Sequence, residues 1–129
     1  MGMTVTHKDG LRFVALTRGH EVISDQPLGK GTDQGMTPPE LLMASLGACI
    51  GVYVVGFAER HHLPHQGLSI DLEWERAEDP ARIAGVKVEV RLPGEVSEEH
   101  RKALHRVAEQ CLIHNTLRNG PEVAITITS

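Results

Sequence analysis

The sequence is poor in aromatic residues and carries no excess of positive charge. Aromatic residues make up 3% of the 129 residues, with one Trp, one Tyr and two Phe, and the formal net charge is −4 at pH 7. Proteins that bind nucleic acids present basic surfaces and aromatic side chains on which bases stack. The composition therefore excludes a nucleic-acid partner. The N-terminus also lacks the basic, apolar and small-residue regions of a signal peptide, so we expect a cytoplasmic protein.

Cysteine is scarce, since Cys49 and Cys111 are the only two. Two cysteines in a cytosolic chain are more often catalytic, metal-binding or inert than joined in a structural disulfide. Residues 61–65 (HHLPH) and the pair Cys111 and His114 have the spacing of metal ligands, but no second C-x-x-C or C-x-x-H accompanies them. We therefore expect neither a metal nor a cofactor. We expect His114 to cap a helix or to form a hydrogen bond near Cys111.

A complete phosphate-binding motif is also missing. Residues 26–36 contain three glycines and one proline, a composition typical of a loop. The segment 29–32 (GKGT) resembles part of a P-loop, but it lacks the first glycine of that motif and no strand leads directly into it. We therefore expect no nucleotide site there.

The longest uncharged run covers residues 41–58. Thr37 is a good N-cap and Glu40 places a carboxylate in the first turn. Pro64 cannot continue a helix, so residues 37–62 are predicted to form one helix of about six to seven turns. The run reaches the lower limit of length for a membrane span. It is rich in glycine, however, and has few flanking basic residues, so we interpret it as a central helix packed against a like helix and expect no membrane span.

Alternating apolar and polar residues predict β-strands on both sides of this helix. Three short strands separated by turns precede it, and two longer strands that should pair as a hairpin follow it. The last residues of the chain alternate as well. The predicted strands cover residues 4–7, 11–17, 20–24, 67–75, 83–92 and 123–127.

A second helix is predicted between the hairpin and the last strand. Ser97 resembles an N-cap that is followed by acidic first-turn residues. Apolar residues then recur at helical spacing, at Leu104, Val107, Ala108, Cys111 and Leu112. Cys111 is therefore predicted to point toward the central helix, where it is either a reactive thiol or plain core packing.

The predicted elements follow the order β-β-β-α-β-β-α-β, with no internal repeat or linker. This order predicts a single α+β domain over residues 1–129, with antiparallel sheets around the long central helix. One small sheet cannot cover an apolar helix on every side. We therefore expect a homodimer in which two central helices pack together beneath two sheets.

Two cysteine motifs resemble those of the OsmC/Ohr family, which is named after osmotically inducible protein C and organic hydroperoxide resistance protein. Residues 37–42 (TPPELL) and 44–49 (ASLGAC) are similar to its central-helix signature, and residues 111–117 (CLIHNTL) resemble its second cysteine motif. Residues 19–20 (GH) and 25–27 (DQP) resemble the N-terminal strands of the general OsmC-like branch. The resemblance covers most of the chain.

The resemblance implies a fold and a reaction. It implies an intertwined homodimer with active sites at the subunit interface. In that family the first cysteine, here Cys49, attacks an organic hydroperoxide. The second cysteine, here Cys111, resolves the resulting sulfenic acid into a disulfide, which a dithiol then reduces.

A cation is needed because Cys49 lies mid-helix, away from the helix N-terminus that could activate a thiol. In the family an arginine from the N-terminal strands of the partner chain does so, held by a glutamate that Glu40 matches. Arg18 is the first candidate for the arginine, and Arg12 and Lys30 compete with it. Glu40 stands nine residues before Cys49, one fewer than in the best-known peroxidase branch, which in an ideal helix places it about 180° away. Either the first turn is irregular or Glu40 has another role.

Three functions fit the sequence. The first is a cytoplasmic, dimeric peroxidase, and the apolar residues around Cys49 favour an alkyl or fatty-acyl peroxide over hydrogen peroxide. The second is a non-enzymatic dimer that binds a small apolar ligand, with its cysteines buried and inert. The third is a metal-binding module. A cation in contact with Cys49 supports catalysis, whereas an apolar shell supports the binder.

Overall fold

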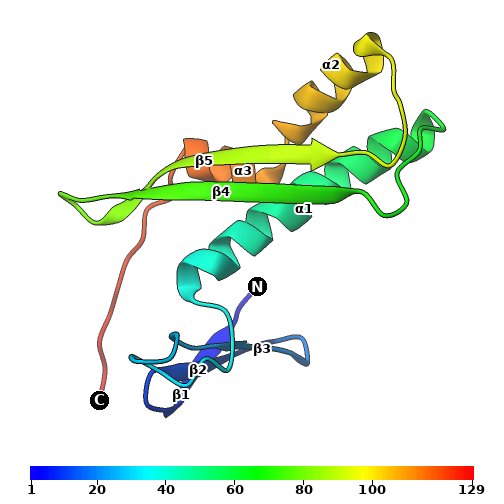
Figure 1. The fold of residues 1–129 in the computed structure, drawn as a ribbon. Helices are drawn as coiled ribbons and strands as arrows, with labels where there is room; N and C mark the ends of the chain where they lie inside the picture. The colour runs from blue at the N-terminus through cyan, green and yellow to red at the C-terminus, as the bar shows by residue number, and fades with distance from the viewer. The chain divides into compact units, whose positions relative to one another are not determined.

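The computed structural model describes residues 1–129, which divide into two compact units, Met1–Ala44 and Ser45–Ser129. The elements follow the predicted order as far as the second helix (Figure 1). They are β1 (Thr4–Asp9), β2 (Arg12–Thr17), β3 (His20–Ser24), α1 (Pro38–Arg60), β4 (Ser69–Ala77), β5 (Arg82–Arg91), α2 (Glu98–Ala108) and α3 (Leu112–Arg118). The α+β class with antiparallel sheets is confirmed, whereas one domain over residues 1–129 stays a prediction.

The first unit contains a three-stranded antiparallel sheet with the order β1-β2-β3. Thr17 of β2 pairs with His20 of β3, and the two-residue turn between them is formed by Arg18 and Gly19. Their φ angles of 50° and 79° lie in the left-handed region. Such a turn matches the twist of the two strands, and glycine adopts it at little cost. The three N-terminal strands and this turn are therefore confirmed.

The loop after β3 is organised by one buried carboxylate. Asp25 is 1% exposed and accepts hydrogen bonds from the Gln26 N–H at 2.7 Å, the Thr32 hydroxyl at 2.7 Å and the Gln34 N–H at 3.1 Å. The hydrogen bond from Thr32 is the main reason that the pKa of Asp25 is lowered, and burial acts in the opposite direction. An added Cβ at Gly31 would lie 2.5 Å from the Asp25 carboxylate. The predicted glycine-rich loop is therefore an ordered structure built around this carboxylate.

α1 runs as a continuous helix through the predicted segment. Thr37 and Glu40 close a capping box, in which the Thr37 N–H donates to Glu40 Oε1 at 2.8 Å and the Glu40 N–H donates to Thr37 Oγ1 at 3.4 Å. By length and composition alone α1 could cross a membrane, with a mean hydropathy of 2.1 over 18 residues. The core helix of a globular protein passes the same test, and 39% of these residues are buried inside the protein.

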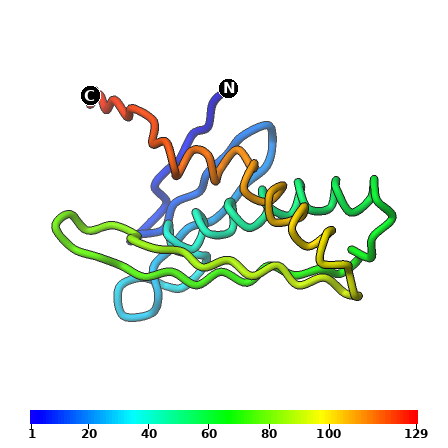
Figure 2. Tube along the Cα trace, turned by 90° about the horizontal axis from the view of Figure 1, so that it is seen from above, coloured from blue at the N-terminus to red at the C-terminus, as the bar shows by residue number.

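The second unit is built on the predicted hairpin of β4 and β5. In it Leu72 pairs with Val88 and Trp74 pairs with Val86. Figures 1 and 2 show the helices of this unit on one side of the hairpin. Side chains from all these elements form one apolar core. Its fully buried members are Leu46, Ile50, Val54, Leu104 and Cys111.

The second helix is interrupted where a continuous helix was predicted. α2 has the predicted N-cap, because the Ser97 hydroxyl accepts the His100 N–H at 3.1 Å. It ends at Ala108, and Cys111 is the N-cap of a separate helix, α3. The prediction that Cys111 lies on the apolar stripe of one continuous helix is therefore wrong, because Cys111 lies between α2 and α3. The physical reason is that side chains of α3 bind the carbonyl groups of Glu109 and Gln110, which follow the end of α2, and so stabilise a break there.

The predicted strand at residues 123–127 is not formed within this chain. These residues have no regular secondary structure, and Val123, Ile125 and Ile127 are 77%, 83% and 92% exposed. A strand satisfies its backbone N–H and C=O groups only by pairing with a neighbour. No strand of the chain pairs with this segment, so its alternating pattern has no partner here.

The buried Asp25 gives a testable pH dependence. We expect Asp25→Asn to destabilise the protein at neutral pH, because a neutral amide replaces an ionised acceptor of three hydrogen bonds. The folded pKa lies below the unfolded value of about 3.9. The ionised carboxylate therefore stabilises the fold above that pH, and this contribution disappears as the pH falls through the folded pKa.

Urea unfolding of the wild type and the variant, from about pH 7 down to about pH 3, measures this effect. The difference in the free energy of unfolding should shrink toward acid. A difference that stays constant over the whole range would contradict the assignment of an ionised Asp25.

Candidate active site

Cys49 lies in the middle of α1 and packs against the apolar core. Its thiol is half-buried and contacts the apolar core. Gly47 and Gly51, one half-turn to either side, face β4. An added Cβ at Gly47 would lie 2.9 Å from a Leu72 methyl group, and one at Gly51 would lie 3.3 Å from an Ile70 methyl group. The absence of side chains at these two positions lets β4 lie close to the turn of α1 that carries Cys49.

Cys111 lies at the start of α3 and is fully buried, with 0% exposure. Its backbone is extended, with φ −65° and ψ 146°, as expected for an N-cap residue. Its Sγ accepts a hydrogen bond from the His114 N–H at 3.2 Å. This contact confirms the prediction that His114 forms a hydrogen bond near the second thiol. Cys111 and His114 thus occupy the N-cap and the third position of α3.

Cys49 packs against the core cluster that contains Cys111, and both cysteines are free thiols. Burial is the main reason that the pKa of Cys111 is raised. The His114 N–H opposes this, whereas a hydrogen bond and the negative charge of Cys49 raise the Cys111 pKa further. Two free thiols that share one core can form a disulfide if their sulfur atoms come within bonding distance. The structure thus brings together two of the predicted site residues.

The other two predicted site residues, Arg18 and Glu40, belong to the first unit. Arg18 is exposed on the turn between β2 and β3 and takes part in no ion pair of the chain. Its competitor Arg12 is already bound, through two contacts with Asp9 at 3.0 and 3.2 Å. The first turn of α1 is regular, and the Glu40 carboxylate binds Thr37. Activation of Cys49 by Arg18 and Glu40 stays a prediction.

The histidines near the end of α1 form contacts of their own. The His61 ring stacks on Phe57, with centroids 4.1 Å apart, and lies 5.6 Å from the His100 ring. The His65 Nδ1 lies 2.9 Å from the Leu63 carbonyl oxygen. In the described chain, residues 1–129, no group of three or more His, Cys, Asp or Glu side chains could hold a metal ion.

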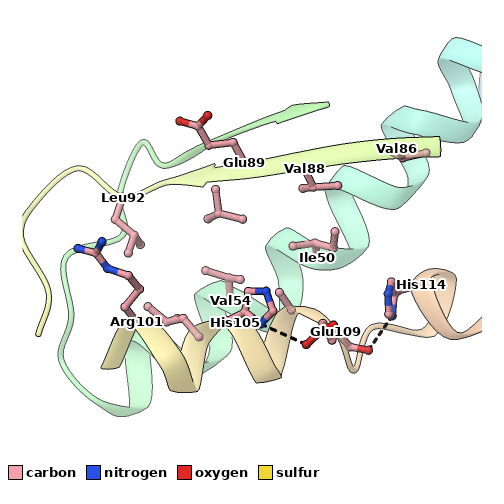
Figure 3. A pocket seen from close by; sticks show the side chains of 13 residues that line it. Ile50, Val54, Val86, Val88, Glu89, Leu92, Arg101, His105, Glu109 and His114 are labelled. Carbon is pink, nitrogen blue, oxygen red and sulfur yellow. Dashed lines mark hydrogen bonds and ion pairs between the residues drawn. The ribbon is translucent and has the colours of Figure 1, made fainter. Parts of the chain in front are cut away.

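A groove lies between α2 and β5 (Figure 3). It has a volume of about 500 Å³. Its floor is apolar and includes Ile50, Val54 and Leu104, which also belong to the core that contains Cys111. Neither cysteine lines the groove itself. Its edge carries polar groups, including His105, whose Nδ1 lies 3.2 Å from the Glu109 carboxylate. Sequence reasoning did not find this groove, because it depends on how α2 crosses the hairpin.

Comparisons with known proteins agree with this fold. A family model described as OsmC-like protein matches residues 31–126. A protein from Psychrobacter arcticus assigned to the osmotic stress and detoxification response is similar with a TM-score of 0.81 and 24% identity, over 88% of this chain and 85% of that chain. An OsmC like protein from Mycoplasma pneumoniae has a TM-score of 0.76 and 20% identity, over 92% and 87%.

A third solved structure, an organic hydroperoxide resistance protein OsmC from Legionella pneumophila, has a TM-score of 0.67 and 21% identity, over 92% of this chain and 90% of that chain. No curated protein sequence matches this chain. At these identities the structural similarities establish the fold alone.

The different environments of the two thiols give a testable difference in reactivity. In the reduced, folded protein we expect an alkylating reagent to modify Cys49 much faster than Cys111. Cys111 is fully buried and its pKa is raised by that burial, so the reactive thiolate is scarce and hard to reach. Peptide mapping by mass spectrometry measures both rates. In denaturant the two rates should become similar, and faster labelling of Cys111 in the folded protein would contradict the arrangement.

Proposed function

Because this chain belongs to the OsmC-like protein family, we propose that it is a cysteine-based peroxidase that reduces organic hydroperoxides in the cytoplasm and works as a homodimer. The observation that carries the proposal is that Cys49 packs against the buried core cluster that contains Cys111. One thiol is half-buried and the other fully buried. This pairing suits a first thiol that meets the substrate and a second that reacts only with the first.

The proposed reaction has three stages. The Cys49 thiolate attacks the terminal oxygen of the hydroperoxide, so that an S–O bond forms, the O–O bond breaks and the alkoxide takes a proton to leave as an alcohol. Cys111 then attacks the sulfenic sulfur, a disulfide forms, and the hydroxyl group leaves as water with the proton of Cys111. An external dithiol reduces the disulfide by two exchange steps and is itself oxidised.

The surroundings of Cys49 favour an apolar substrate. Its neighbours in the core include Leu46 and Ile50, which would contact the alkyl chain of an organic hydroperoxide better than hydrogen peroxide. Burying one methylene group contributes about 0.8 kcal/mol, so a longer alkyl chain should bind more tightly. The Legionella protein named for organic hydroperoxide resistance supports the same substrate class.

A homodimer is supported by the apolar side chains that one chain leaves uncovered on α1. Val52 is 70% exposed and Tyr53 is 38% exposed, although both lie within the uncharged run. A second copy that covers this face would remove these side chains from water. The family resemblance implies that such a dimer brings the Arg18 of one chain to the Cys49 of the other.

The peroxidase proposal is tested by replacing each cysteine in turn. With a dithiol present, the wild type should consume cumene hydroperoxide and form a disulfide between Cys49 and Cys111 within one chain. Cys49→Ser should abolish turnover, because an alcohol neither ionises near neutral pH nor forms a sulfenic acid. Cys111→Ser should still consume one equivalent but stop as sulfenic acid or become over-oxidised.

Hydroperoxide consumption is followed with a colorimetric peroxide assay, and the oxidised cysteines are identified by peptide mapping. Full turnover by Cys49→Ser would overturn the proposal. A disulfide that links two chains would overturn the resolving role of Cys111 within one chain.

The role of Arg18 across the dimer has its own test. Arg18→Ala should keep the fold but slow the attack on peroxide strongly, since removing one charge partner commonly shifts a thiol pKa by about 1–3 units. Arg18→Lys should recover only part of the rate, because lysine lacks the planar guanidinium fork. Arg12→Ala is the matched control, because Arg12 is held by Asp9.

Mixing inactive Cys49→Ser with Arg18→Ala distinguishes an arginine in the partner chain from one in the same chain. If Arg18 acts across the dimer, hybrid dimers regain one intact site and the mixture recovers activity. Stable monomers in sedimentation, or a mixture that stays as slow as its components, would contradict this arrangement.

The groove supports the alternative function, a non-enzymatic binder of a small apolar ligand. It is apolar, concave and of the size of small-molecule sites, and neither cysteine lines it. If this alternative holds, a long-chain alcohol should bind with the same affinity to the wild type and to Cys49→Ser, and neither protein should consume peroxide.

A further inference from the structure

The break between α2 and α3 is held by two side chains that point back from α3. The His114 Nδ1 lies 2.8 Å from the Glu109 carbonyl oxygen, and the Asn115 Nδ2 donates to the Gln110 carbonyl at 3.4 Å. Figure 3 shows the first of these contacts. A carbonyl oxygen only accepts hydrogen bonds, so the His114 Nδ1 carries the proton in this contact. The carbonyl groups of the two residues between α2 and Cys111 thereby gain hydrogen-bond donors.

The backbone N–H group of His114 also contacts Cys111. The His114 N–H donates to the Cys111 Sγ at 3.2 Å, so His114 binds the end of α2 with its ring and the thiol with its main chain. α3 has only seven residues and none of them is buried. A helix of that length is not stable alone. Its orientation, and with it the position of the His114 N–H, therefore depends on the contacts at this junction.

The resolving step needs the N–H at that place. Cys111 must lose its proton to attack, and its burial opposes the loss because a charge is costly in an apolar core. A backbone N–H that donates to the sulfur stabilises the thiolate more than the thiol. The pKa of Cys111 follows this pattern, since burial raises it and the His114 N–H lowers it.

We propose that His114 is a positioning residue for the resolving thiol: its ring, bound to the Glu109 carbonyl, holds the His114 N–H against the Cys111 sulfur. The ring itself does not touch the reacting atoms in this role. The inference rests on the proposed function in that Cys111 is taken as the thiol that attacks an oxidised Cys49.

The attack can be measured without peroxide. The aromatic disulfide reagent 5,5′-dithiobis(2-nitrobenzoate) converts Cys49 to a mixed disulfide and releases one coloured aryl thiolate. The Cys111 thiolate then attacks the Cys49 sulfur, the Cys49–Cys111 bond forms, the mixed disulfide breaks and a second aryl thiolate leaves. The second release reports the resolving step, whether or not peroxide is the natural substrate.

We expect His114→Ala to slow the second release by about threefold below the pKa of Cys111. One unit of higher pKa lowers the thiolate fraction about tenfold, and the more basic thiolate recovers about threefold in nucleophilicity. Above that pKa the difference should disappear. His114→Asn should restore the wild-type rate, because its amide N–H lies close to the place of Nδ1, whereas His114→Gln should not.

Asn115→Ala is the matched control, since it removes the neighbouring contact of the same junction and leaves the His114 N–H in place. It should leave the pH profile of the second release unchanged. Equal slowing of His114→Ala at every pH, or a rate like that of the wild type, would overturn the inference. The proposed function would be contradicted if the wild type completes the second release but consumes no peroxide. The inference would still hold in that case if His114→Ala slows the second release and His114→Asn restores it.

Discussion

The covering of α1 is the constraint on which the rest of the structure depends. The helix carries no charged residue from residue 41 to residue 58. Its mostly apolar surface is therefore more stable when it is covered than when it is exposed to water. The second unit buries one side of it, at Leu46, Ile50 and Val54, under the β4–β5 hairpin and α2. Glycines on that side let β4 approach closely. The opposite side keeps exposed apolar groups such as Val52.

The same constraint separates the roles of the two thiols. Cys49 lies within a regular helix, where the backbone N–H groups are already used by the helix itself. In the proposed reaction Cys49 therefore needs a side-chain cation for activation. Cys111 lies at a helix start, where N–H groups are free, and one of them donates to its sulfur. Because the two environments differ in this way, we propose activation of one thiol by a charged side chain and of the other by a backbone N–H.

Much of this arrangement is readable from the sequence, and the exceptions have physical reasons. Alternation and capping residues identify the strands, α1 and the start of α2, because those signals act over a few neighbouring residues. The break before Cys111 is hidden, because apolar residues continue at helical spacing across it. It is decided by contacts of His114 and Asn115 with the α2 end, which compete with a continuous helix. The apolar stripe predicted that Cys111 points toward the central helix, and the family resemblance added its reaction with Cys49.

The last predicted strand shows a different limit. Residues 123–127 have the alternation of a strand, yet their apolar side chains are exposed and no neighbour pairs with them. The β4–β5 sheet of the same unit has two strands and is stabilised by its packing against the helices. In a single chain, residues 123–127 have no strand to pair with, and one side of α1 keeps apolar side chains exposed to water. In the proposed homodimer a second copy would cover the exposed side of α1 and could pair with residues 123–127. The same dimer would place the Arg18 of one chain near the Cys49 of the other, so the proposed active site depends on the proposed assembly.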